Sequence, residues 1–144
     1  MYKIFCDGGS RGNPGPAAGA FIVFDQNGKI VTKHGEYLGV ATNNVAEYSA
    51  VLLAMEWLRE NKINQEVKFF LDSQLITNQL IGTYKIKDTK LAVLATKVKN
   101  IKRNFPQRIT YINIPREQNK IADLLVNEVL DKKSRSEKSN IKSI

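Results

Sequence analysis

Hydrophobic and polar positions at the start of the chain follow the pattern of three short strands. Apolar residues dominate the runs 2–7 and 17–25, the run 30–38 begins and ends with apolar pairs, and each run has the length of a β-strand. Residues 26–29 separate the last two runs and contain Asn-Gly, which is a strong hairpin signal between such segments. The pattern therefore predicts an antiparallel meander.

The apolar spacing changes to three and four residues from Asn44 onward, and this is the period of an amphipathic helix. We expect this helix to end near residues 61–62. The elements expected after it are a strand at 66–71, a short helix at 74–80, a helix at 90–104 that Pro106 ends, a strand at 109–114, and a last helix that Asn119 caps and that runs to about Leu130.

This order of strands and helices is typical of an α/β fold. The connections from the first strand to the fourth, and from the fourth to the fifth, contain helices, which favours parallel pairing through right-handed crossovers. We therefore expect a mixed five-stranded sheet, three antiparallel strands and then parallel strands, flanked by helices. The expected division is one domain at 1–131 and a mobile, basic, Ser- and Lys-rich tail at 132–144.

Composition and charge restrict the function. The net charge is +8, which favours a polyanionic partner, although surface lysines that only aid solubility explain it equally well. No apolar run reaches the roughly 18 residues of a membrane span, and the chain begins in a strand without signal-peptide features, so a cytoplasmic protein is expected. The single cysteine, Cys6, excludes an intrachain disulfide and a cysteine-based zinc site.

Four carboxylates stand where these elements begin or end. Asp7 precedes glycines, and turn formation is the commonest use of Asp-Gly. Glu47 follows Asn44 with the spacing of a capping box. Asp72 precedes a helix start, and Asp123 lies in a first helical turn, where the helix dipole favours an acid. Each of the four residues has an ordinary structural explanation when it is taken alone.

Taken together, the four acids predict a cation site. Asp7 and Asp72 end strands that should be parallel neighbours, and ligand sites in open α/β sheets gather at that edge. The helix starts near Glu47 and Asp123 can point at the same edge. Four carboxylates there would repel one another, so their pKa values would rise or a cation would bind. With a single histidine, His34, in a distant strand, an all-oxygen site suits Mg²⁺ or Mn²⁺.

Four segments of the chain, in order, resemble type 1 ribonuclease H. They are residues 5–15, 42–47, 71–74 and 115–123, and the similarity covers residues 1 to about 131. This family hydrolyses the RNA strand of RNA–DNA hybrids and leaves 5′-phosphate and 3′-hydroxyl ends. The resemblance implies a ribonuclease H-like catalytic domain, with a hybrid duplex as its partner, without a membrane, and as a monomer.

The resemblance also implies that Asp7, Glu47, Asp72 and Asp123 are the catalytic, metal-binding set. Two Mg²⁺ or Mn²⁺ ions roughly 4 Å apart would activate a water and stabilise the 3′-oxyanion. Asp7 would bridge the ions, Glu47 and Asp72 would complete one site, and Asp123 would help to hold the other. Glu47 could also accept a hydrogen bond from a ribose 2′-hydroxyl, which distinguishes RNA from DNA.

Further residues would contact the substrate by the same resemblance. The glycines after Asp7 would let backbone amides approach the RNA sugars. The short amides of Asn13, Asn43 and Gln74 would lie in the minor groove, and Thr42 would meet a DNA phosphate. Arg116, in a loop that lacks the histidine of many members, could take over part of that role by contacting a phosphate. The full set is Gly8, Gly9, Ser10, Asn13, Thr42, Asn43, Gln74 and Arg116.

Two departures from the family pattern match a short bacterial and archaeal subgroup. The loop at 115–119 lacks the histidine that many members carry, and only residues 84–90 stand in the place of the basic helical handle. The lysines at 85–90 and in the C-terminal tail could compensate for the handle. The alternatives that remain open are a nuclease that also cuts double-stranded RNA, an integrase-like or junction-resolving nuclease, and a non-catalytic hybrid-binding module.

Overall fold

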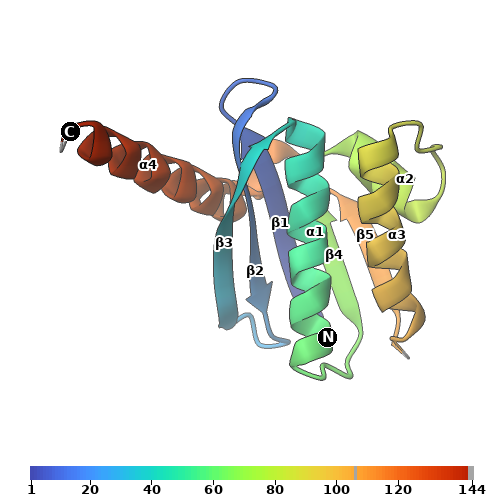
Figure 1. Cartoon of the computed structure of the whole chain (residues 1–144). Helices are drawn as coiled ribbons and strands as arrows, with labels where there is room; N and C mark the ends of the chain where they lie inside the picture. The colour runs from blue at the N-terminus through green and yellow to red at the C-terminus, as the bar shows by residue number, and fades with distance from the viewer. Residues whose placement is uncertain (106, 143–144) are drawn as a thin grey trace.

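A five-stranded mixed sheet forms the centre of the computed structural model, which describes residues 1–105 and 107–142 (Figure 1). The strands lie in the order β3-β2-β1-β4-β5, antiparallel from β1 to β3 and parallel among β1, β4 and β5. This arrangement confirms the predicted fold class. The strands are β1 (Tyr2–Ser10), β2 (Gly15–Phe24), β3 (Ile30–Ala41), β4 (Val67–Leu71) and β5 (Ile109–Asn113).

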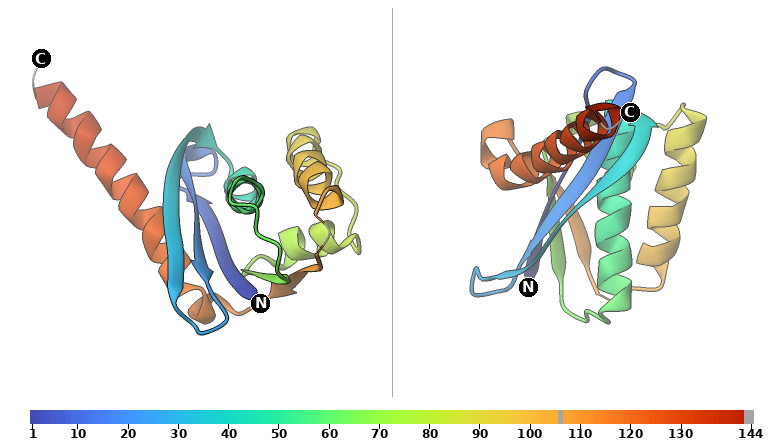
Figure 2. Two further views of the ribbon diagram at one scale, coloured as in Figure 1. Left: turned by 90° about the horizontal axis from the view of Figure 1, so that it is seen from below. Right: turned by 60° about the vertical axis from the view of Figure 1, so that its left-hand side comes forward.

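Helices cover both faces of the sheet (Figure 2). On one face α1 packs on β1 and β2 with α3 beside it, and on the other face α4 packs on β2 and β3. None of the helices in the described ranges is long and apolar enough to cross a membrane. The helices are α1 (Asn43–Glu60), α2 (Gln74–Ile81), α3 (Thr89–Arg103), the 3₁₀ turn η1 (Arg116–Gln118) and α4 (Lys120–Lys142).

The two faces are packed in different ways. Large side chains such as Phe69, Tyr48 and Met55 fill the layer between the sheet, α1 and α3, where they are fully buried. Burial of each such side chain contributes about 1.5–3 kcal/mol. On the other face Ala18 and Ala20 of β2 meet α4. These small residues let α4 approach the sheet closely, which fixes the position of its first half.

The predicted end of the last helix near Leu130 is wrong, because α4 continues to Lys142. Its first half is held by buried residues, so each further residue only adds a hydrogen bond to an existing helix. The ammonium group of Lys133 lies 5.0 Å from the centre of the Tyr37 ring and 4.0 Å from the Glu137 carboxylate. Residues 132–142 therefore form a helical extension. Pro106, which was expected to end α3, lies outside the described residues; Asn104 ends that helix.

Close contact between β1 and α1 predicts a large effect for one added methyl group. A Cβ atom at Gly8 would lie 2.2 Å from the carbonyl carbon of Ala46 and 2.5 Å from the amide nitrogen of Glu47. Since both are backbone atoms, Gly8→Ala should lower the free energy of unfolding by about 3 kcal/mol in urea denaturation. Gly9→Ala is the control, because its Cβ would have no neighbour nearer than 3.8 Å. Equal stability of the two variants would contradict this packing.

Candidate active site

Asp7 lies inside a continuous strand and not in a turn. β1 extends to Ser10, and Asp7 pairs with Ala20 of β2 in the antiparallel ladder. The parallel pairing of β1 with β4, in contrast, ends where Phe5 meets Phe70. Asp7 therefore lies just past the end of the parallel ladder, at the carboxyl edge of the sheet. The expectation that the strand ends at Asp7, and the turn explanation with it, are wrong.

Glu47 does not belong to a capping box. The Oγ1 atom of Thr42 accepts a hydrogen bond from the amide of Val45 at 3.2 Å and caps α1. The helix therefore begins at Asn43, one residue before the predicted start, and Glu47 lies beyond the capping position. The capping-box explanation fails for this reason. The Glu47 carboxylate is left to face the cavity at the sheet edge.

Asp72 and Ser73, at the end of β4, have different roles: Ser73 caps the next helix and Asp72 does not. The Oγ atom of Ser73 accepts a hydrogen bond from the amide of Ile76 at 3.2 Å and caps α2. Asp72 is not used as a cap, and its Oδ2 atom accepts a hydrogen bond from Asn119 Nδ2 at 3.0 Å. The helix-start explanation therefore applies to Ser73 and leaves Asp72 free for another function.

Asn119 is a positioning residue whose role the sequence pattern does not reveal. Its side chain is 1% exposed, and Nδ2 donates to the carbonyl of Cys6 at 2.8 Å as well as to Asp72. α4 begins directly after it, as predicted, but its Oδ1 atom has no hydrogen-bond partner within the described part of the chain. The Asn119 amide thus connects the end of β4 to β1 beside Asp7, rather than capping the helix.

The acids predicted from the sequence meet in one place. One carboxylate oxygen from each of Asp7, Glu47 and Asp72 lies within 4.8 Å of the other two. Asp123, in the first turn of α4, lines the same cavity of about 430 Å³ but is not in that group of three. The structure therefore brings all four acids to one cavity, and three of them to distances that suit a shared cation.

Burial and mutual repulsion change the acidity of this cluster. Burial, followed by the charges of Asp72 and Glu47, raises the pKa of Asp7 to about 8. Burial and Asp72 likewise raise the pKa of Glu47 to about 7, although a hydrogen bond from Ser73 and the charge of Arg116 oppose the rise. A divalent cation would replace these protons and remove the repulsion. The oxygen donors fit Mg²⁺ or Mn²⁺.

Three of the predicted substrate-contact residues hold the β1–β2 loop against the start of α1. Oδ1 of Asn43 accepts hydrogen bonds from the amide of Ser10 at 2.8 Å and from its hydroxyl at 3.3 Å. The amide of Asn43 donates to Oδ1 of Asn13 at 3.1 Å. Ser10 and Asn43 also line the cavity that contains the acids. This network fixes the loop beside the carboxylates.

The other predicted substrate-contact residues occupy different positions. Gly8, Gly9 and Arg116 line the cavity, whereas Thr42 and Gln74 lie at the starts of α1 and α2, outside its lining. Gly8 has a packing role that the sequence interpretation did not include, because α1 leaves no room for a side chain there. His34 is half-exposed on β3, with Nε2 3.2 Å from Oε1 of Glu36.

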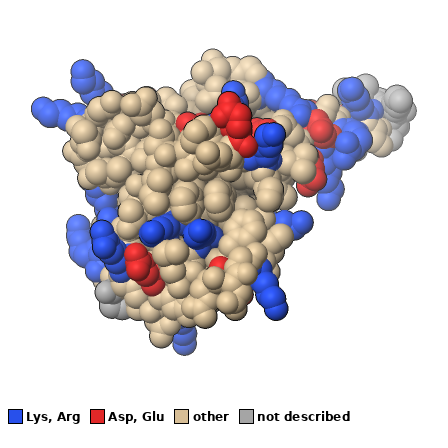
Figure 3. Space-filling view, turned by 180° about the vertical axis from the view of Figure 1, so that it is seen from behind, with Lys and Arg blue, Asp and Glu red and all other residues tan. Residues whose placement is uncertain are grey.

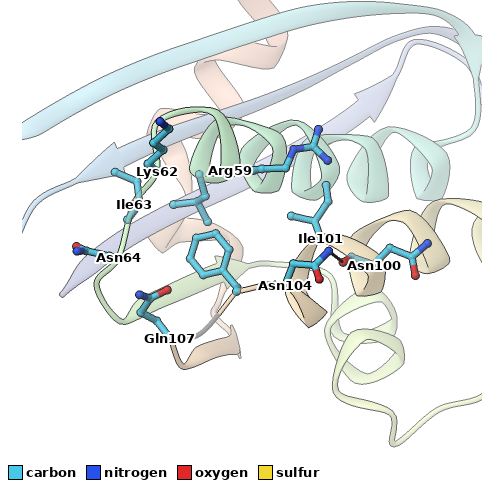
Figure 4. Close-up of a pocket in the computed structure, with 10 residues that line it drawn as sticks. Arg59, Lys62, Ile63, Asn64, Asn100, Ile101, Asn104 and Gln107 are labelled. Atoms are coloured by element: carbon cyan, nitrogen blue, oxygen red, sulfur yellow. Dashed lines mark hydrogen bonds between the residues drawn. The ribbon is translucent and has the colours of Figure 1, made fainter.

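A second hollow of about 380 Å³ lies at the other end of α1 (Figure 4). Ile63 and Ile101 contribute apolar surface, and amide side chains such as Asn64 and Asn104 surround it. The described residues that line it include no carboxylate. This hollow therefore cannot supply a cation site of the kind formed at the carboxyl edge of the sheet.

Sequence comparisons point to one family. The reverse transcriptase-like family matches residues 5–129. A ribonuclease HI of Halobacterium salinarum is 38% identical over 128 residues, which are 88% of this chain and 63% of the relative. A bifunctional protein of Mycobacterium tuberculosis is 34% identical over 92% of this chain and 36% of the relative. The chain thus spans less than two thirds of these relatives.

Solved structures agree with the sequence comparisons. The RNase H1 of Halobacterium salinarum superposes with a TM-score of 0.86 at 35% identity, over 91% of this chain and 98% of the other. LC11-RNase H1 in complex with an RNA/DNA hybrid superposes with a TM-score of 0.88 at 39% identity, over 92% and 98% of the two chains. The similarity therefore extends over nearly the whole of these two domains.

The acidity of Asp7 predicts how stability depends on pH in the absence of metal. A carboxyl with a pKa of about 8 in the folded state and about 3.9 in the unfolded state binds its proton more tightly when folded. The melting temperature in EDTA should therefore fall as the pH rises from about 4 to 8. Asp7→Asn should flatten this dependence, whereas Glu60→Gln, at the exposed end of α1, should keep it. A metal-free protein that becomes more stable over this range would contradict the prediction.

The position of Asn119 predicts an effect on metal binding. Asn119→Ala removes the hydrogen bonds to Cys6 and Asp72, so Mg²⁺ or Mn²⁺ affinity should fall about tenfold or more in calorimetric titration. Asn113→Ala is a matched control, because it removes one bond to the carbonyl of Leu71 at 3.1 Å without touching an acid. Equal metal affinities of the two variants would show that Asn119 does not position the site.

Proposed function

Because the chain belongs to the type 1 ribonuclease H family, we propose that it hydrolyses the RNA strand of RNA–DNA hybrids, leaving 5′-phosphate and 3′-hydroxyl ends. The observation that carries the proposal is the cluster of Asp7, Glu47 and Asp72 in a cavity that also contains Asp123. The hybrid bound by LC11-RNase H1 supports the choice of substrate. The four acids, all present and gathered together, favour an enzyme over a binding module.

The four carboxylates are the residues that would hold two Mg²⁺ or Mn²⁺ ions. Such ions, when bound, supply an activated water and stabilise the negative charge on the leaving 3′-oxygen. Asp7 is the best candidate for a ligand that both ions share, because its carboxylate interacts with Glu47 and Asp72 and also with Asp123. All three charges raise the pKa of Asp7, whereas Asp123 does not contribute to the raised pKa of Glu47. Its position just past the β1–β4 ladder leaves the carboxylate facing the cavity.

The residues around the acids would orient the duplex. Glu47 can accept a hydrogen bond from a ribose 2′-hydroxyl, a group that DNA lacks. Ser10, Asn13 and Asn43 form one hydrogen-bonded unit, so their amide and hydroxyl groups would meet the minor groove in a fixed arrangement. Thr42 lies at the N-terminus of α1, where the helix dipole and free amides favour a phosphate.

Arg116 is the group that stands in the place of the missing histidine. It lines the cavity, and its positive charge opposes the rise in the pKa of Glu47 that burial and Asp72 cause. A guanidinium is always protonated, so it cannot exchange a proton during the reaction. It can instead bind a phosphate oxygen with two parallel hydrogen bonds. We therefore assign Arg116 to phosphate binding beside the acids and not to proton transfer.

Cleavage of labelled RNA–DNA, RNA–RNA and DNA–DNA duplexes with Mg²⁺, Mn²⁺ or EDTA tests this proposal. We expect cleavage of the hybrid that depends on a divalent ion, with 5′-phosphate products. Asp7→Asn should lower the rate about a thousandfold or more, because metal-assisted stabilisation is worth several kcal/mol. Glu60→Gln serves as the control for an acid outside the cavity.

Three results of these cleavage assays would contradict or change the proposal. Absence of hybrid cleavage with either metal would overturn the proposed enzyme. A near-normal rate for Asp7→Asn would show that the site lies elsewhere. Cleavage of the RNA–RNA duplex at a similar rate would broaden the substrate to A-form duplexes, which share the wide minor groove.

A further inference from the structure

We propose that the C-terminal end of α4 is an arm that binds the phosphate backbone of the hybrid at a distance from the cleaved bond. The arm is defined as residues 134–142, the part of α4 beyond Lys133. The identity of the duplex rests on the proposed function. The evidence comes from the packing, charge and helical position of the residues in and before the arm.

The arm projects from the domain as a continuation of a firmly packed helix. Val126 and Leu130 are buried against β2, and the ammonium group of Lys133 lies over the Tyr37 ring of β3. Beyond that point α4 extends past the β3 edge of the sheet (Figures 1 and 2). Because the helix is continuous, the packed half fixes the direction of the projecting half.

The charge of this extension matches a polyanion. Residues 132–142 contain five basic residues and one acid, and basic side chains gather on the projecting end of the molecule (Figure 3). Asp131 would weaken this match, but its Oδ1 atom pairs with Arg11 at 2.5 Å. Lys133 is held by Tyr37. Arg135 and Lys138 are exposed and available for a partner.

Helical spacing directs two of these cations to one face. Asp131, Arg135 and Lys138 are related as i, i+4 and i+7, so they share a side of the helix. Asp131 on that side contacts Arg11, which lines the cavity that contains the acids. The face that carries Arg135 and Lys138 is therefore continuous with the rim of the active site.

The distances suit a duplex that spans the site and the arm. At 1.5 Å per residue, Arg135 and Lys138 lie about 18 and 22 Å along α4 from Asp123. This length corresponds to about six base pairs at 3.4 Å per pair. The α2–α3 connection with Lys85 and Lys87 lies toward the β5 edge, on the opposite side from the arm. The two basic regions would thus hold a duplex on both sides of the acids.

The chemistry of the arm favours phosphates over other partners. Residues 134–142 contain a single apolar residue, Ile141, so the arm has no apolar stripe for a membrane surface or for a groove that accepts an amphipathic helix. Lysine and arginine on a solvated helix face are typical of contacts to the nucleic-acid backbone, which carry no sequence preference. This property suits an enzyme that must act on hybrids of any sequence.

Binding of fluorescent hybrids to the full chain, in the Asp7→Asn background with Mg²⁺, tests the arm. The probes are a hybrid of about 20 base pairs and a hairpin-linked hybrid of about 4, which at about 3.4 Å per pair is too short to reach from the acids to Arg135 and Lys138. Arg135→Gln combined with Lys138→Gln should weaken binding of the long hybrid about tenfold. It should also reduce the slope of log affinity against log salt by about two, one for each lost phosphate contact. Binding of the short hybrid should not change.

Two further variants make the result specific. Lys133→Gln removes one charge from the same helix, but Lys133 lies on the side opposite Arg135, over Tyr37 of β3, so the long hybrid should bind almost as before. Arg135→Lys combined with Lys138→Arg keeps the charges and should retain the wild-type affinity. Far-UV circular dichroism reports whether α4 stays helical in each variant.

The possible outcomes separate this inference from the proposed function. Loss of all hybrid cleavage and binding in the parent protein would contradict the proposed function itself. Normal cleavage by the parent, with unchanged long-hybrid affinity and salt dependence in the double glutamine variant, would overturn the arm alone. An equal loss in Lys133→Gln would also overturn it, because the effect would then reflect total charge and not this face.

Discussion

Repulsion among carboxylates that are buried or half-buried is the constraint on which the rest of this structure depends. Asp7, Glu47 and Asp72 lie close enough to share a cation, and the surroundings already disfavour the ionised forms of Asp7 and Glu47. Groups that repel one another stay together only where the chain around them is rigid, since otherwise the side chains would move apart into water. The surrounding architecture is best understood as the means of holding these acids in place.

Several short contacts provide that rigidity. Gly8 allows the backbone of α1 to approach β1, so that Glu47 comes next to Asp7. Asn119 connects β1 to Asp72 through two hydrogen bonds in a fully buried position. Ser73 both caps α2 and donates to Glu47. Each contact joins two different elements, so the site is assembled from the whole sheet edge and not from one loop.

The acids and most of the basic residues that could bind the substrate lie in different parts of the molecule. The acids and the Ser10–Asn13–Asn43 unit lie at the carboxyl edge, whereas many of the lysine and arginine residues lie in the α2–α3 connection, in α3 and in the second half of α4. Exposed charges far from the acids can attract a duplex without changing the repulsion among the carboxylates, because solvent screens exposed charges beyond about 10 Å. A basic arm on α4 would therefore strengthen substrate binding without disturbing the metal site.

The amino-acid sequence by itself determined the order and type of the elements, the mixed sheet and the identity of the four acids. Period-two and period-3.6 patterns are local, and acids at the ends of elements fall at one edge once the strands pair. Tertiary structure decided what local patterns do not encode. β1 continues through Asp7 because β2 still pairs with it, Thr42 and not Asn44 caps α1, and Asn119 turns its amide toward Asp72.

Residues 132–142 show most clearly that local sequence patterns do not encode the effect of packing. Their Ser- and Lys-rich composition predicted a mobile segment after residue 131, yet they continue α4, because a helix that packing has already started extends at little further cost. Composition indicates the conformation that a segment would prefer in isolation. Here the first half of α4, which is packed on the sheet, makes the helical conformation favourable for the residues that follow it. The sequence therefore predicted which acids would come together, and only the packed structure determined which contacts hold them in place.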